Sequence, residues 1–129
     1  MTHLGELYKC NICGNVIEIT HEGIGNLICC NEAMKLLEEK IPNSSDAHYA
    51  HIEKLDEITK KIYFNHPMTN EHYIDFIEVV SLDNKYIKRK HLKPNDKAEL
   101  VFKCNCEEGF FVRNYCNIHE LNKTQDEEK

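Results

Sequence analysis

Four cysteines in the first 36 residues are the feature that most restricts how this chain can fold. Cys10 and Cys13 are separated by two residues, and the adjacent pair Cys29 and Cys30 follows after fifteen more. A segment this short cannot bury enough apolar surface to be stable alone, so it needs a staple. Four clustered thiolates suit zinc or iron, and their spacing does not choose between the two metals. Because neighbouring side chains of an extended chain point to opposite sides, ligation of one metal by Cys29 and Cys30 should strain the local backbone.

Cysteine content and charge together limit the class of protein. The chain has 129 residues, seven cysteines, eight histidines and a formal charge of −6. Seven cysteines cannot all pair within one chain, and the first ten residues lack the basic start and apolar stretch of a secretory signal. We therefore expect a cytoplasmic protein whose clustered cysteines are metal ligands or redox thiols. The negative charge disfavours nucleic-acid binding, and no apolar run approaches the length of a membrane span.

The sequence divides near residue 40, which predicts domains at 1–37 and 38–129. In the first domain, residues 16–20 alternate apolar and polar side chains, which predicts a strand, and residues 27–28 are interpreted as the start of its return strand. Residues 34–40 are expected to be a short helical segment or an irregular exit. A polar linker containing a proline follows at 41–46.

The second domain is predicted to be an antiparallel β-sandwich. Short β-type runs separated by turn signals lie at 49–55, 58–64, 73–82, 86–92, 98–103 and 110–115. Six or seven such runs at this spacing favour two packed antiparallel sheets. The apolar run at 73–80 is interpreted as a core strand and the lysine-rich stretch at 85–93 as a solvated edge strand. The polar residues 122–129 are expected to form a frayed tail.

A second group of ligand-type side chains is dispersed along this domain. It consists of His48, His66, His72, Cys116 and His119. Spacing alone favours only Cys116 and His119, as a C-x-x-H chelate, because a single histidine is more often a surface or core residue than a ligand.

Two long motifs change that interpretation through their resemblance to known families. Tyr8-Lys9-Cys10-x-x-Cys13-Gly14-Asn15 with Cys29-Cys30 resembles the desulforedoxin module. His66-Pro67-Met68-x-x-x-His72-Tyr73-Ile74 and Tyr115-Cys116-Asn117-Ile118-His119 resemble the catalytic module of superoxide reductase. In this order, and over nearly the whole chain, the motifs resemble desulfoferrodoxin, the two-iron form of superoxide reductase.

The resemblance implies a fold and two iron centres. The first module would hold a distorted Fe(Cys)4 centre through Cys10, Cys13, Cys29 and Cys30. The second module would be an immunoglobulin-like, seven-stranded sandwich with an Fe(II)/Fe(III) centre. Its ligands would be four equatorial imidazoles and one axial thiolate with the sixth position open: His48, His66, His72, His119 and Cys116.

An activity and partners follow from the same resemblance. Superoxide would be reduced to hydrogen peroxide by one electron and two protons, without dismutation, as a defence against oxidative stress. The resemblance also implies a homodimer and an electron-donor protein such as rubredoxin. An electron-transfer protein without a dedicated substrate, or a zinc-stapled structural module, are the alternatives from other functional classes.

Several residues depart from the family pattern. The family commonly has Glu-Lys before the first ligand histidine, where Lys attracts superoxide and Glu can occupy the open site, whereas this chain has Asp46-Ala47. This departure bears on how the substrate is captured, and the ligand set is the same. Cys104 and Cys106 are also outside the pattern and are interpreted as a redox-sensitive pair or, more simply, as two tolerated thiols. His51 should face away from His48 and is expected not to be a ligand.

Overall fold

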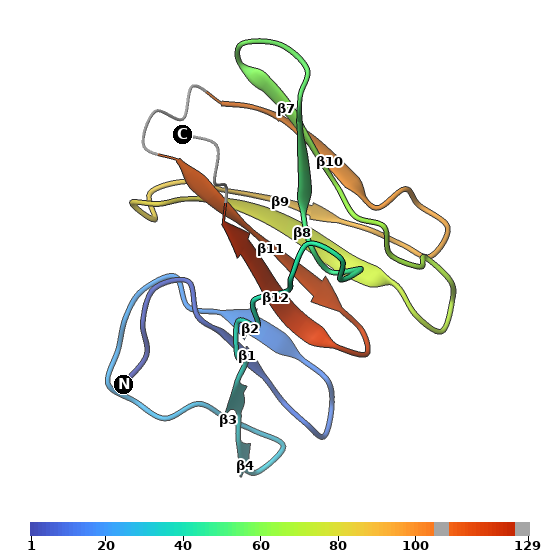
Figure 1. Ribbon diagram of the computed structural model, residues 1–129. Helices are drawn as coiled ribbons and strands as arrows, with labels where there is room; N and C mark the ends of the chain where they lie inside the picture. Colours follow the sequence, from blue (N-terminus) through green and yellow to red (C-terminus); the bar gives the residue numbers. More distant parts are fainter. Residues whose placement is uncertain (105–108, 126–129) are drawn as a thin grey trace. The chain divides into compact units, whose positions relative to one another are not determined.

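The computed structural model describes residues 1–104 and 109–125, and none of these residues forms a helix. The described chain divides into two compact units, Met1–Glu38 and Glu39–Lys129. The described residues of the two units form twelve strands, whose arrangement is drawn in Figure 1. The first unit contains β1 (Leu7–Lys9), β2 (Val16–Glu18), β3 (Ile28–Cys29), β4 (Glu32–Ala33) and β5 (Lys35–Leu36). The second contains β6 (His51–Lys54), β7 (Thr59–Tyr63), β8 (Ile74–Ser81), β9 (Ile87–His91), β10 (Glu99–Lys103), β11 (Phe110–Cys116) and β12 (Glu120–Gln125).

The first unit is a small three-stranded sheet with a separate short hairpin. β1 lies between β2 and β5, and β3 pairs with β4. Few apolar side chains are buried in this unit: Leu7, Cys10, Ile19 and Leu37. So small a core supports the expectation that the unit needs a staple.

One prediction for the first unit is wrong and another holds only in part. Residues 27–28 do not return along the predicted strand, because β2 pairs with β1 and β3 pairs with β4. Strand β1 has only three residues, which is too short to show an alternating pattern in the sequence. The segment predicted as a helix or irregular exit contains the short strand β5, whose Leu36 is the register partner of Tyr8, and is irregular at 37–39.

The second unit is the predicted all-β sandwich, and its residues within 39–104 and 109–125 form seven strands. One sheet has the order β10-β7-β6 and the other β12-β11-β8-β9 (Figure 1). The core between the sheets is built from apolar side chains of both, including Ile62, Phe102, Ile77 and Val112. As expected, β8 is a buried core strand and β9 is a fully exposed edge strand.

The expected frayed tail is wrong over residues 122–125. These residues belong to β12, which pairs with β11 from Phe111 opposite Gln125 to Cys116 opposite Glu120. Leu121, Asn122 and Thr124 are buried although two of them are polar. The polar composition concealed the strand, because backbone pairing to β11 and side-chain hydrogen bonds replace an apolar pattern here. Residues 126–129 lie outside the described part of the chain.

Candidate metal centres

The four cysteines of the first unit converge on one point. Their sulfur atoms all lie within 4.8 Å of one another. Cys13 Sγ is 3.5 Å from Cys29 Sγ, which is 4.0 Å from Cys30 Sγ. Thiolates at about 2.3 Å from one tetrahedral metal are about 3.8 Å apart, so these separations suit a single ion in a distorted tetrahedron.

The backbone around the cysteines adopts the conformations that such a cluster needs. Cys30 has φ 53° and Asn31 has φ 64°, in the left-handed region that residues other than glycine seldom adopt. The expected strain at the adjacent cysteine pair is therefore present. Gly14, with φ 84°, turns the chain after Cys13 and donates its N–H to the Cys10 carbonyl.

The thiol groups of this cluster differ in acidity. Backbone N–H groups of Cys13 and Ile12 lower the pKa of Cys10 to about 6. Hydrogen bonding to Cys13 and Cys10 raises the pKa of Cys29 to about 12. The fold thus stabilises the thiolate of Cys10, and a bound cation would have to stabilise those of Cys29 and Cys30.

The second group assembles at one end of the sandwich. His48 precedes β6, His66 follows β7, His72 precedes β8, Cys116 ends β11 and His119 lies in the β11–β12 turn. Because paired strands in both sheets are antiparallel, the start of one strand lies beside the end of its neighbour. These strand starts and strand ends therefore meet at the same end of the sandwich. This is why residues distant in sequence converge, and why spacing did not reveal them.

His48 and His66 point their Nε2 atoms at each other, 3.1 Å apart and buried. The Nδ1 of His48 lies 2.8 Å from Asp46 Oδ1, and the Nδ1 of His66 lies 2.6 Å from the Pro67 carbonyl oxygen. Carbonyl and ionised carboxylate oxygens only accept, so each Nδ1 carries the hydrogen and each Nε2 presents a lone pair.

Two lone pairs facing each other need a cation between them. Burial lowers the pKa of His48 and lowers that of His66 to about 4, so neither ring is readily protonated at neutral pH. Imidazole nitrogens that share one metal at about 2.1 Å are about 3.0 to 3.4 Å apart, which matches the observed separation. The pair therefore fits a metal ion.

The remaining members complete the group. The ligand atoms of His48, His66, His72 and Cys116 all lie within 4.8 Å of one another. His72 Nε2 is buried and has no hydrogen-bond partner, which is costly unless a ligand meets it. His119 lies outside that tight grouping, but its Nδ1 is 3.8 Å from Cys116 Sγ and its ring centroid is 5.0 Å from that of His48. Cys116 itself is fully buried.

Asparagine side chains hold this group together. Asn117 accepts a hydrogen bond from Tyr73 N at 2.9 Å and donates to the Glu71 carbonyl at 2.9 Å, so it grips the chain on both sides of His72. Asn114, which is 1% exposed, donates to the His48 carbonyl at 2.9 Å. Residue spacing predicts neither role, although Asn117 lies inside the C-x-x-H chelate.

A cation lies beside the group although position 47 is alanine. Lys40 Nζ donates to the His119 carbonyl at 2.5 Å. Backbone hydrogen bonds from Lys40 N to the Leu121 carbonyl and from Lys123 N to the Lys40 carbonyl fix this residue against β12. Lys40 therefore adds positive charge next to the His119 turn.

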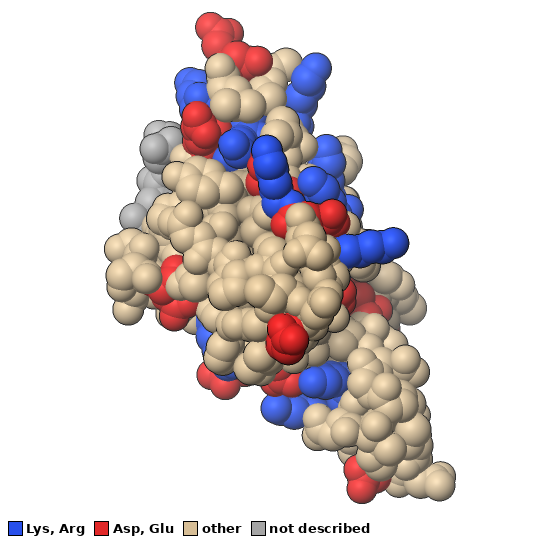
Figure 2. All heavy atoms as spheres, turned by 90° about the vertical axis from the view of Figure 1, so that its right-hand side faces the viewer, with Lys and Arg blue, Asp and Glu red and all other residues tan. Residues whose placement is uncertain are grey.

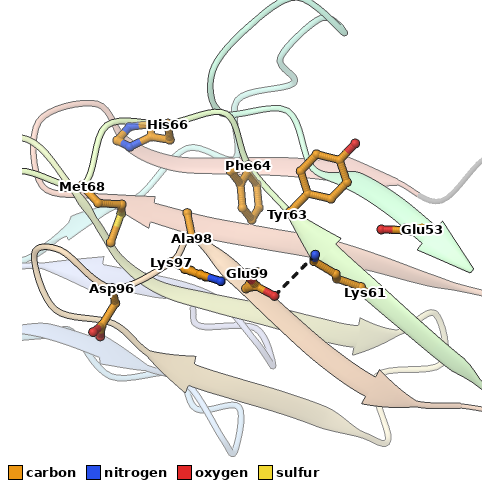
Figure 3. A pocket seen from close by; sticks show the side chains of 10 residues that line it. All are labelled: Glu53, Lys61, Tyr63, Phe64, His66, Met68, Asp96, Lys97, Ala98 and Glu99. Atoms are coloured by element: carbon orange, nitrogen blue, oxygen red, sulfur yellow. Dashed lines mark ion pairs between the residues drawn. The ribbon is translucent and has the colours of Figure 1, made fainter. Parts of the chain in front are cut away.

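A shallow groove of about 460 Å³ borders His66 (Figure 3). Its charged lining residues are Glu53, Asp96, Glu99, Lys61 and Lys97, and Lys61 pairs with Glu99 at 3.6 Å. The acidic and basic side chains nearly cancel, so the groove lacks the charge that would select a small anion.

Cys104 and the other histidines of the described residues lie outside both groups. His51 stacks on Tyr63 with ring centroids 5.1 Å apart, as expected for a residue outside the ligand set. Cys104 packs against the sandwich core and is disulfide-bonded. Cys106 lies outside the described residues, so the redox-sensitive interpretation stays a prediction. No helix in the described part of the chain is long and apolar enough to span a membrane.

Comparison with known proteins agrees with both groups. The family model described as "Desulfoferrodoxin, N-terminal domain" matches residues 2–37, and the model described as "Desulfoferrodoxin" matches residues 39–125. A desulfoferrodoxin homolog from Archaeoglobus fulgidus is 37% identical, over 94% of this chain and 97% of its own length. The desulforedoxin of Megalodesulfovibrio gigas is 47% identical over 26% of this chain and 92% of its own length.

The fold is also similar to that of a solved structure. The superoxide reductase of Treponema pallidum superposes with a TM-score of 0.70 at 19% identity, covering 92% of this chain and 95% of that chain. At that identity the likeness concerns the fold, a cysteine-rich module and an immunoglobulin-like sandwich. The family models together match nearly all of the chain, and the cysteine and histidine–cysteine groups suit two iron centres. The chain is therefore a member of the desulfoferrodoxin family.

Proposed function

We propose that the chain is a superoxide reductase, which converts superoxide to hydrogen peroxide: O2•− + e− + 2H+ → H2O2. The single observation that carries the proposal is the convergence of the ligand atoms of His48, His66, His72 and Cys116 within 4.8 Å of one another, with His119 beside them. Several neutral imidazoles with one thiolate are a donor set suited to redox iron.

Each residue has an assigned role in this proposal. The ligands of the second iron would be His48, His66, His72, His119 and Cys116. Iron bound there would supply the single electron by cycling between Fe(II) and Fe(III). Cys116 is the only anionic donor of the set, and its full burial keeps the thiolate away from water. Four neutral imidazoles and one thiolate leave Fe(II) with a net charge of +1, which attracts an anion.

The attraction is local, because the protein as a whole is acidic. Figure 2 shows acidic and basic side chains side by side around a largely uncharged area of one face. Lys40, hydrogen-bonded to the His119 carbonyl, adds one positive charge next to the group. His119 is exposed whereas Cys116 is buried, so solvent reaches the group on the histidine side and brings the two protons.

The cysteine group would have a separate task. We assign Cys10, Cys13, Cys29 and Cys30 to an Fe(Cys)4 centre that staples residues 1–37. Residues 38–129 would carry the reaction. A one-electron donor protein such as rubredoxin would reduce the chain, which we expect to be a cytoplasmic homodimer engaged in defence against oxidative stress.

The product ratio tests the proposal. Reduction yields one peroxide for each superoxide consumed and no oxygen, whereas dismutation yields one peroxide and one oxygen for every two. Iron analysis of natively produced protein comes first, because zinc in both groups would favour a structural module. Two irons per chain without superoxide consumption would favour an electron-transfer protein.

A further inference from the structure

Asp46 is the side chain most closely tied to the histidine–cysteine group without belonging to it. One oxygen, Oδ1, lies 2.8 Å from His48 N and 2.8 Å from His48 Nδ1. The hydrogen bond that His48 N donates to the Asp46 side chain, two residues earlier, forms an Asx turn. This turn fixes the carboxylate relative to the backbone of His48. His48 is thereby held by hydrogen bonds to both its imidazole ring and its backbone N–H.

We propose that Asp46 is a positioning residue that orients His48 for the metal and adjusts the electron density of its ring. This inference rests on the proposed function for the identity of the group. The Asp46 side chain is 43% exposed, so the carboxylate is ionised at neutral pH and only accepts hydrogen bonds. It therefore selects the tautomer with hydrogen on Nδ1 and leaves Nε2 free, aimed at His66 Nε2.

The other imidazoles show why this matters. His66 Nδ1 likewise donates a hydrogen bond, to the Pro67 carbonyl, but a carbonyl carries no net charge. Asp46 places a carboxylate, which carries a full negative charge, 2.8 Å from His48 Nδ1. A carboxylate bonded to the far nitrogen of a metal-bound imidazole makes the ring a stronger donor. Asp46 therefore favours the more highly charged state of the metal.

Two substitutions separate positioning from charge. Asp46→Ala removes both hydrogen bonds, whereas Asp46→Asn keeps an oxygen in place and removes the charge. Asp56 supplies matched controls, because its Oδ1 accepts from Ile58 N at 2.9 Å and Thr59 N at 2.7 Å in the turn after β6, at the opposite end of the sandwich. Asp56→Ala and Asp56→Asn therefore disturb a similar turn with no histidine attached.

The first measurement is cobalt(II) retention by the second group in competition with a chelator. We expect Asp46→Ala to weaken retention about 10- to 100-fold and Asp46→Asn less, with the Asp56 variants unchanged. The second is the midpoint potential of the iron form. Asp46→Asn should raise it, and a roughly threefold change in relative affinity corresponds to about 28 mV at about 59 mV per tenfold.

The outcomes are decisive. Equal cobalt retention and equal potential in the Asp46 and Asp56 variants would overturn the inference. If the Asp46 variants change metal binding as expected but the wild type consumes no superoxide, only the proposed function is refuted. Refolding controls are unnecessary for the second measurement, because Asp46→Asn is isosteric and the potential is read only on protein that holds iron.

Discussion

Asn117 connects the segment that carries Cys116 with the segment that carries His72. Removing its side chain should therefore lower the affinity of the group for metal without unfolding the sandwich. Its side chain makes two hydrogen bonds of 2.9 Å, one from Tyr73 N and one to the Glu71 carbonyl. Its backbone N–H also donates to the Tyr73 carbonyl at 3.1 Å, and a substitution leaves this bond in place. Asn117→Ala therefore removes two bonds that fix the position of His72 relative to Cys116.

The magnitude follows from those two bonds. Each contributes about 1 kcal/mol net, so up to about 2 kcal/mol of ordering is lost. If metal binding must then restore that order, affinity falls by about 10- to 30-fold, since about 1.4 kcal/mol corresponds to tenfold. Asn117→Asp keeps the acceptor for Tyr73 N and loses the donor to Glu71, so it should fall between the wild type and Asn117→Ala.

The assay is iron loss to a chelator, followed through the sulfur-to-iron absorption of the oxidised second site. Asp83→Ala is the control, because Asp83 also makes two bonds, to Ser81 Oγ and Lys85 N, in the turn after β8 at the far end of the sandwich. Equal rates of iron loss from Asn117→Ala and Asp83→Ala would show that the two Asn117 hydrogen bonds beside His72 contribute nothing to iron binding.

Three further predictions concern separate parts of the chain. Cys13→Ser should remove the first iron and speed amide exchange in residues 1–38 while superoxide consumption by the second unit persists; complete loss of consumption with the second iron intact would contradict this. Ala47→Lys should raise the rate of superoxide capture a few-fold at low ionic strength, because an ammonium at about 6 Å and a dielectric of about 40 contributes on the order of 1.4 kcal/mol. Salt should shrink the gain, and an unchanged rate would indicate that Lys40 already supplies the charge. In the metal-free protein, burial lowers the pKa of His66 to about 4, so the unfolded chain takes up a proton first as pH falls. The resulting stability is present above about pH 6.5 and is lost between about 6.5 and 4, by up to about 3 kcal/mol; urea unfolding should show the loss, and an equal loss in His66→Gln would contradict the assignment.

The sequence predicted the first metal group better than the second, for a physical reason. Cys10 and Cys13 lie on one tight turn, and Cys29 and Cys30 follow within the same small module, so local spacing carries the information. His48, His66 and His72 meet only because antiparallel strands bring their ends to one edge of the sandwich. Spacing contains nothing of that topology, and only the resemblance of the surrounding motifs identified these residues.

The sequence did not predict the strands whose formation depends on pairing with neighbouring strands. β1 is three residues long and β12 is largely polar, so neither shows its own periodicity, and both are set by pairing with neighbours. In the sequence, Asp46 stands out only as a departure from the family pattern. Its bond to His48 Nδ1 depends on a turn that brings a side chain back onto a ring two residues ahead. A carboxylate two residues before a candidate ligand is the signal that would have found it.

The most direct test of the account mixes a pulse of superoxide with the fully reduced protein and follows the absorption of the second iron. We predict that the sulfur-to-iron band appears at a rate proportional to protein concentration, that one peroxide forms per superoxide, and that Cys116→Ser abolishes the band. Superoxide that decays only at its spontaneous rate, or that yields oxygen with half an equivalent of peroxide, would contradict superoxide reduction by this chain.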